Sequence, residues 1–127
     1  MELNEDPVEA VLREIFEETG LVSKISKNPN ATTLHFDYPE IIEPPRHILI
    51  ESIDDPKDGH HQHIDMIYYC YPVDGIMDLL PGWSLFSYEV LENALKVHQL
   101  GKEPLNPSIY PPLDVLTLGV DAINATI

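Results

Sequence analysis

The chain has 127 residues, of which 43% are hydrophobic and 8% aromatic, and these values predict one folded domain and exclude a disordered chain. Twenty-two acidic residues against seven basic ones give a formal net charge of −15, which excludes the basic surface typical of nucleic-acid-binding proteins. No apolar run approaches the roughly 20 residues that span a bilayer, so we expect a protein away from membranes. The single cysteine, Cys70, cannot form an internal disulfide, which is typical of a cytoplasmic protein.

A helix is predicted over residues 7–19 because both of its ends carry the expected signals. Asp6 is a good N-cap residue, Pro7 suits the first helical position, and Glu9 follows Asp6 by three residues as in a capping box. Gly20 is placed to end the helix in a left-handed conformation. One stripe at helical spacing is formed by Val8, Val11, Leu12, Ile15 and Thr19.

Strand signals dominate the middle of the chain. β-Branched and aromatic residues between turn formers predict strands over residues 21–26, 32–38, 46–53 and 64–73. The polar segment 54–59 connects the last two, which are therefore expected to form a hairpin. Another short strand is predicted over residues 83–86.

Two helices are predicted near the end of the chain. Ser87 can cap a helix that runs to about Leu100 and is ended by Gly101. Pro111 and Pro112 can open a last helix, in which Gly119 costs about 1 kcal/mol relative to alanine. A helix, several strands and then helices indicate a mixed α/β or α+β domain.

Three glutamates of the first predicted helix, Glu14, Glu17 and Glu18, stand at i, i+3 and i+4 and so share one face. Like charges at this spacing cost a few tenths of a kcal/mol per pair, and the helix dipole disfavours anions near the C-terminal end by about 0.3–1 kcal/mol each. A solvated acidic face is one interpretation. The other is a site for Mg²⁺, which binds a few carboxylate oxygens together with water and substrate phosphate.

The residues around these glutamates carry a resemblance to a known family. Glu5, seven further residues and then Arg13-Glu14-Ile15-Phe16-Glu17-Glu18-Thr19-Gly20-Leu21 fill every fixed position in the larger part of the pattern Gx5Ex7REUxEExGU, where U is aliphatic. This segment resembles the Nudix box. The motif is specific, and the rest of the chain resembles the family only in the outline of its strands and helices.

The resemblance implies an activity and a role for each matched residue. Nudix enzymes hydrolyse a diphosphate linkage in a nucleoside diphosphate joined to another group. Glu14, Glu17 and Glu18 match the carboxylates that ligate Mg²⁺ or Mn²⁺, and Arg13 matches the arginine that orients one of them. Glu5 matches the acid that braces the loop and helix, and Gly20 matches the turn glycine. The implied chemistry is metal-assisted hydrolysis.

The first glycine of the family pattern would fall before Met1, and the strands that precede the box in the family have no counterpart here. We therefore expect an N-terminally truncated, Nudix-like α/β/α sandwich with a mixed β-sheet. It would form a single domain over residues 1–127, with the catalytic loop and helix at 1–21, the sheet at about 21–86 and C-terminal helices at about 87–124. Because an open sheet edge invites pairing with another chain, a homodimer is our hypothesis.

The general base has more than one candidate. Some family members use the first glutamate of the helix, which corresponds to Glu14, whereas others use an acid from a later loop. Asp78 and Glu89 are the candidates for that second role. A turn residue and an acid in the first turn of a helix are their alternative interpretations.

A histidine-rich segment, His60-His61-Gln62-His63-Ile64-Asp65, suggests a second kind of site. In an extended conformation His61, His63 and Asp65 share one face of a strand, and such a trio can hold Zn²⁺. A polar turn whose histidines line a substrate cleft or face water is the other interpretation, in which His61 and His63 are candidate substrate contacts.

Several other side chains are candidates for substrate contacts. Arg46 can bind a phosphate or form a surface ion pair, and Asp78 is a candidate substrate contact as well as a base. Four aromatic residues can stack on a nucleobase or belong to the core: Tyr68, Tyr69, Tyr71 and Trp83.

The sequence therefore favours a metal-dependent hydrolase that acts on a nucleotide-type small molecule with Mg²⁺ or Mn²⁺. An inert Nudix fold that binds nucleotides or a partner without turnover is the first alternative. A zinc-binding module built on His61, His63 and Asp65 is the second.

Overall fold

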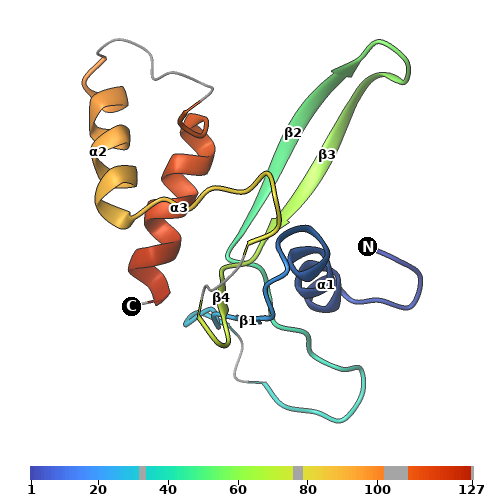
Figure 1. Cartoon of the computed structure of the whole chain (residues 1–127). Helices are drawn as coiled ribbons and strands as arrows, with labels where there is room; N and C mark the ends of the chain where they lie inside the picture. Colours follow the sequence, from blue (N-terminus) through green and yellow to red (C-terminus); the bar gives the residue numbers. More distant parts are fainter. Residues whose placement is uncertain (32–33, 76–78, 102–108, 127) are drawn as a thin grey trace. The chain divides into compact units, whose positions relative to one another are not determined.

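The computed structural model describes residues 1–31, 34–75, 79–101 and 109–126 and shows a chain of mixed helix and strand (Figure 1). Its elements follow the order α1, β1, β2, β3, β4, α2, α3. The chain divides into two compact units, Met1–Pro81 and Gly82–Ile127, which are described separately below. None of the helices among the described residues combines the length and the apolar character needed to cross a membrane.

Helix α1, Pro7–Thr19, has the ends that the sequence predicts. The Asp6 side chain accepts a hydrogen bond from the backbone N–H of Glu9 at 2.8 Å, which satisfies one of the free N–H groups of the first turn. At the other end Gly20 has φ +82° and its N–H donates to the carbonyl of Phe16. The predicted helix is confirmed, because its caps are local signals.

The described residues of the first unit form two separate two-stranded antiparallel sheets. Strand β1, Ser23–Ile25, pairs with β4, Cys70–Pro72, and lies next to α1 in the chain. Strand β2, His47–Asp55, pairs with β3, Gly59–Ile67, and forms a long hairpin (Figure 1). Within the described residues every strand pair is antiparallel, so the mixed sheet expected from the resemblance is not formed by these four strands.

The turn of the β2–β3 hairpin is fixed by one carboxylate and one glycine. Asp55 accepts hydrogen bonds from the backbone N–H groups of Lys57 at 2.7 Å and Asp58 at 3.2 Å, and these bonds lower the pKa of the Asp55 carboxyl. Gly59 follows with φ +77°, a conformation that glycine adopts without strain. Pairing therefore begins directly at Asp55 and Gly59.

The two faces of this hairpin differ in chemistry. One face carries the cross-strand pairs Ile48–Met66 and Ile50–Ile64, and these apolar side chains are largely exposed, Ile50 to 67%. The opposite face carries Glu51 across from His63. Among the described residues each of the two strands pairs only with the other, and the homodimer stays a prediction.

The sequence-predicted strand over residues 64–73 is wrong as a single element. Strand β3 begins earlier, at Gly59, and ends at Ile67, and β4 then pairs with β1 instead of β2. The change of partner occurs at Tyr68 and Tyr69, where Tyr69 is buried and its carbonyl accepts from the N–H of Ser26. This buried tyrosine anchors the point at which the chain leaves one sheet for the other.

Two other predicted strands are also wrong. The described part of the segment 32–38, residues 34–38, contains no strand, and its alternating apolar side chains Leu34, Phe36 and Tyr38 are exposed. A strand is stable only when it pairs and buries one face, and here that face lies in solvent. Residues 83–86 also contain no strand.

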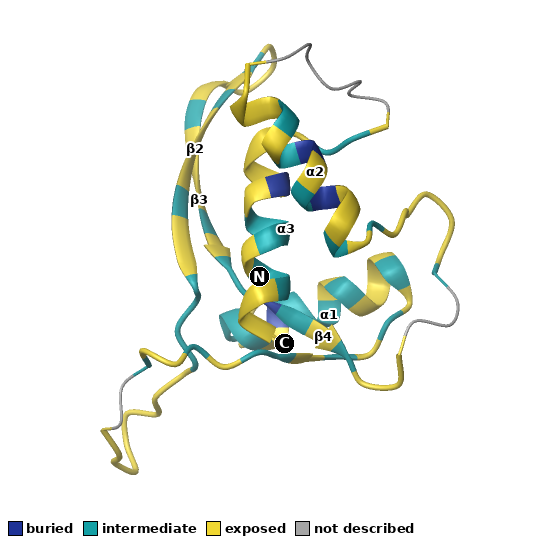
Figure 2. Cartoon of the chain, turned by 90° about the vertical axis from the view of Figure 1, so that its left-hand side faces the viewer, coloured by how far each residue is buried: buried dark blue, intermediate teal, exposed yellow. Residues whose placement is uncertain are grey.

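In the described part of the second unit, two helices pack on each other. Helix α2, Tyr88–Gln99, is capped by the Ser87 side chain, and α3, Leu113–Thr126, follows Pro112 as predicted. The buried residues on the facing sides of the two helices are Leu91, Ala94 and Leu116 (Figure 2). A Cβ atom at Gly119 would lie 3.2 Å from Leu91 Cδ1, so glycine allows α2 to approach α3 closely.

We expect Leu116→Ala to lower the free energy of unfolding by about 2–5 kcal/mol, because Leu116 is 1% exposed and its truncation leaves a cavity between α2 and α3. The measurement is urea unfolding followed by far-UV circular dichroism. The control is the neighbouring Val115→Ala, which is 47% exposed and should change stability by no more than about 0.5 kcal/mol. Equal losses in the two variants would contradict the α2–α3 packing.

Candidate functional site

Helix α1 presents Glu14, Glu17 and Glu18 to solvent on one side, as their spacing predicts. The side chains of Glu14 and Glu17 are about half exposed. Ala10, one turn before Glu14 on the same side of the helix, is buried, whereas Val8, Leu12 and Ile15 on the opposite stripe are half-buried. The three carboxylates themselves remain accessible to water and to a cation.

The end of this helix is held by contacts beyond its own caps. The Thr19 hydroxyl donates to the carbonyl of Ile15 at 2.6 Å and accepts from the N–H of Leu21 at 3.2 Å. The N–H of Leu80 donates to the carbonyl of Thr19, and a Cβ atom at Gly20 would come within 3.4 Å of the Leu80 side chain. Gly20, the turn glycine of the motif, is therefore packed against Leu80 of the same unit.

Arg13 connects the loop before the helix with the acidic face. Its Nε and Nη2 donate to the two carboxylate oxygens of Glu5 at 2.8 and 3.3 Å, a bidentate pair. Its Nη1 donates to Glu17 at 3.0 Å, and its Nη2 lies 3.6 Å from a carboxylate oxygen of Glu14. One guanidinium thus orients Glu17 and fixes the loop residue Glu5, whose side chain is 11% exposed.

These contacts lower the pKa of the Glu5 carboxyl. The hydrogen bond from Arg13 is the main cause, and the N–H of Glu2, which donates to Glu5 at 2.9 Å, adds to it. A lowered pKa in the folded state means that the ionised Glu5 contributes stability above the ordinary carboxyl pKa. That stability is lost as the pH falls through the lowered value.

Glu18 differs from the other two glutamates of the face, because it forms no ion pair within the described residues. Three exposed carboxylates suit Mg²⁺ or Mn²⁺, which are hard cations that accept oxygen ligands and retain water. In the described part of the chain no three histidine, cysteine or acidic side chains are grouped closely enough to hold an ion. The kinds of ligand present suit a magnesium-like ion, but their positions do not form a site, so binding would require Glu14 and Glu17 to reorient around Arg13.

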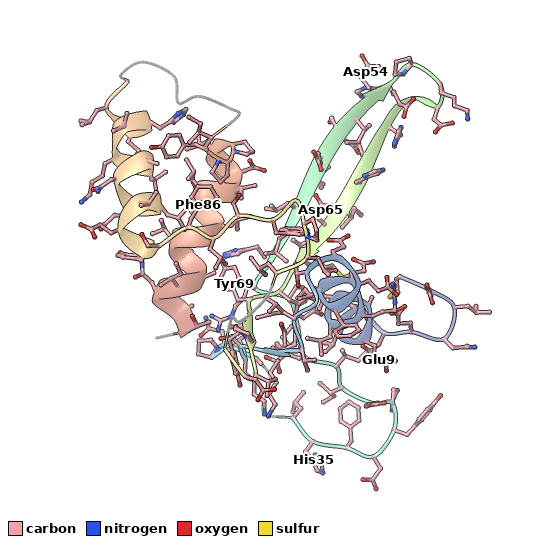
Figure 3. The ribbon with its side chains drawn as sticks, in the orientation of Figure 1. Glu9, His35, Asp54, Asp65, Tyr69 and Phe86 are labelled. Atoms are coloured by element: carbon pink, nitrogen blue, oxygen red, sulfur yellow. The ribbon has the colours of Figure 1, made fainter. Side chains whose placement is uncertain are left out.

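A cleft of about 330 Å³ lies beside the acidic face. Helix α1 contributes Glu14, and strand β3 contributes Asp65, so two carboxylates from distant parts of the sequence border the same cavity. The side-chain view shows Asp65 on the hairpin at the end nearer to α1, whereas Asp54 lies at the hairpin tip (Figure 3). The remaining lining is mostly apolar: Met1, Pro7, Ala10, Val11, Ile64, Met66 and Tyr68.

Sequence reasoning did not place Asp65 and Tyr68 beside Glu14. Tyr68 lines the cleft, and its hydroxyl donates to the carbonyl of Glu43 at 2.9 Å. Burial is the main cause that raises the pKa of Tyr68, so it stays a neutral donor. The aromatic residue was a stacking candidate, but no local signal indicates that the end of β3 meets the first helix.

The other predicted substrate contacts lie away from this cleft lining. The Arg46 Nη2 donates to the Lys27 carbonyl at 2.8 Å and to the Ser26 hydroxyl at 3.2 Å, and its guanidinium lies 5.5 Å from the centre of the Tyr69 ring. His61 and His63 lie further along β3, towards the hairpin turn. None of these three residues borders the cleft with Glu14.

The two candidates for a later-loop base have different positions. Asp78 lies outside the described residues, and Glu89 lies in the first turn of α2, in the second unit. Trp83 also belongs to the second unit and is half exposed, and Tyr71 lies in β4. Their roles stay predictions.

Cys70 is half-buried in β4 opposite Ile25. Burial raises the pKa of its thiol to about 11. At neutral pH the thiol is therefore protonated, which makes it a poor nucleophile and metal ligand.

Comparison with known proteins adds no relative to this picture. None of the protein-family models, curated protein sequences or solved structures compared with the chain matches it. Functional inference consequently depends on the α1 motif and on the geometry described above.

We expect Arg13→Gln to raise the pKa of Glu5 towards the ordinary carboxyl value and to move acid unfolding to a higher pH, because the main cause of the lowered pKa is removed. The measurement is a carbon-13 NMR titration of the glutamate carboxyls. Lys96→Gln, which removes an exposed pairing with Glu92 on α2, is the control and should leave Glu5 unchanged. An ordinary pKa for Glu5 in the wild-type protein would disprove the bidentate pair.

Cys70 should react with iodoacetamide at pH 8 roughly a hundredfold more slowly than an unhindered cysteine whose pKa is 9, because its pKa of about 11 lowers the thiolate fraction by that factor. The rate should rise with pH up to about 11. Mass spectrometry of the alkylated protein measures both values, and unfolding in urea should restore the ordinary rate.

Proposed function

We propose that this protein is a metal-dependent pyrophosphohydrolase of the Nudix type that hydrolyses a diphosphate linkage in a nucleoside diphosphate joined to another group. The observation that carries the proposal is the Arg13 network: the side chains matched by the motif are connected by hydrogen bonds from Arg13 to Glu5 at 2.8 Å and to Glu17 at 3.0 Å. Local helix stability does not require such an arrangement of acids.

Within this proposal each motif residue has a structural task. Glu5 and Arg13 hold the loop against the helix and aim the carboxylate of Glu17, while Glu18 is available without breaking an ion pair in the described residues. Mg²⁺ or Mn²⁺ would be held by Glu14, Glu17 and Glu18, and when bound it would neutralise the diphosphate and lower the pKa of a bound water. The protein's own role is to orient these carboxylates and to receive the substrate.

The cleft beside Glu14 is the proposed position of the substrate. Its apolar lining side chains could contact a base or another flat group, and its acidic members Glu14 and Asp65 would repel a free diphosphate unless a cation intervened. Glu14 borders both the cleft and the acidic face, so it is also the described residue best placed to act as the general base. A Nudix-like sandwich remains the proposed architecture.

The test is hydrolysis of a panel of nucleoside diphosphate derivatives by the full chain in MgCl₂, with phosphate-containing products detected by chromatography. We expect Glu18→Gln to lower kcat by about a hundredfold or more, since a lost ligand should cost at least as much as a lost supporting residue. Glu9→Gln is the matched control on the same helix, because Glu9 lies in the first turn, near Asp6, and should retain activity.

Two outcomes would overturn the proposal that the protein is a hydrolase. Metal-dependent binding of the nucleotides without any product would favour the inert binding module instead. Equal activity in the wild-type protein and in Glu18→Gln would assign any observed hydrolysis to other residues or to a contaminant.

A further inference from the structure

The face of the β2–β3 hairpin that carries His61 and His63 places two imidazole rings at the spacing of one metal ion, and a third ligand would have to move in to complete a site. The two side chains stand at i and i+2 on β3, and their ring centres are 5.0 Å apart. Two imidazole rings that ligate one tetrahedral Zn²⁺ through nitrogens at about 2.0–2.1 Å have their centres about 5 Å apart. The pair is therefore spaced for one ion.

The hydrogen bond of the His61 ring also favours a ligand role. Its Nδ1 lies 3.1 Å from the backbone carbonyl oxygen of Gly59. A carbonyl oxygen only accepts hydrogen bonds, so Nδ1 is the donor in this contact, which leaves Nε2 as the nitrogen that can bind an ion. Histidines that bind metals commonly donate their second ring N–H to a backbone carbonyl in this manner, which fixes the tautomer and the ring orientation.

The strand register supplies a third ligand that the sequence did not indicate. Glu51 on β2 lies directly opposite His63, at a position where Cβ atoms are about 4.5–5.5 Å apart. Asp65, the sequence-predicted third ligand, is four residues from His61, or about 13 Å along an extended strand. Glu51 is therefore better placed than Asp65, and its exposed side chain is free to change rotamer.

We propose that His61, His63 and Glu51 form a binding site for one divalent ion of the zinc class, distinct from the carboxylate face of α1. Two imidazole nitrogens and one carboxylate suit Zn²⁺, Ni²⁺ or Cu²⁺, whereas Mg²⁺ prefers oxygen ligands throughout. Three protein ligands leave one position for water. The site goes beyond the proposed hydrolase function and does not depend on it.

The experiment is a calorimetric titration of ZnCl₂ into the full chain at pH 7.5 in excess MgCl₂, which occupies hard oxygen sites. We expect uptake of one equivalent, with at least a tenfold loss of affinity in His61→Ala, in His63→Ala and in Glu51→Gln. The matched control is His60→Ala, which removes a histidine from the opposite face of the same strand and should keep the wild-type affinity.

A nitrogen-15 NMR spectrum of the histidine rings gives an independent measurement. Zinc should shift the Nε2 resonance of His61 while Nδ1 stays protonated. The proposal is overturned if zinc uptake is absent, if it survives in both His61→Ala and His63→Ala, or if it is lost in Glu18→Gln instead. Circular dichroism of each variant verifies that the substitution has not unfolded the hairpin.

Discussion

The guanidinium group of Arg13 holds together carboxylates that would otherwise repel one another. Glu5 comes from the loop before α1, and Glu14 and Glu17 come from the helix itself, yet all three meet the same planar cation. A lysine would retain the charge but not the fork of donors that binds Glu5 through two oxygens while a third bond reaches Glu17. The geometry of the acidic face therefore depends on this one side chain.

The same helix is also fixed at its far end, and this explains why the motif includes residues that carry no charge. Gly20 lies next to the Leu80 side chain, and the Thr19 hydroxyl links the last turn to Leu21. Arg13, in the middle of α1, and these contacts at its C-terminal end fix the position of the helix that carries the carboxylates. The carboxylates of Glu14 and Glu17 would still have to turn away from Arg13 to bind an ion, so the helix supplies their position but not their final orientation.

The helices could be predicted from the sequence almost to the residue, because Asp6, Ser87, Pro112 and Gly20 act on their own turns of the chain. The pairing of the strands could not be predicted, because it depends on residues that are far apart in the sequence. The segment near Tyr69 changes from one sheet to the other, and no nearby residue signals that change. The candidate sites likewise have parts that the sequence predicts and parts that it does not. The shared face of the three glutamates follows from helical spacing, whereas the cleft and the opposition of Glu51 to His63 arise only when remote strands meet.

The short turn between Asp55 and Gly59 also constrains how this protein can evolve. Adding or deleting a single residue there would slip the strands by one position, and alternation would then bring the histidines of β3 onto the side occupied by Ile48 and Ile50. Insertions that preserve the hairpin should therefore come in even numbers or form a bulge. Turn length, and not only residue identity, is thus a heritable property that related sequences would have to keep.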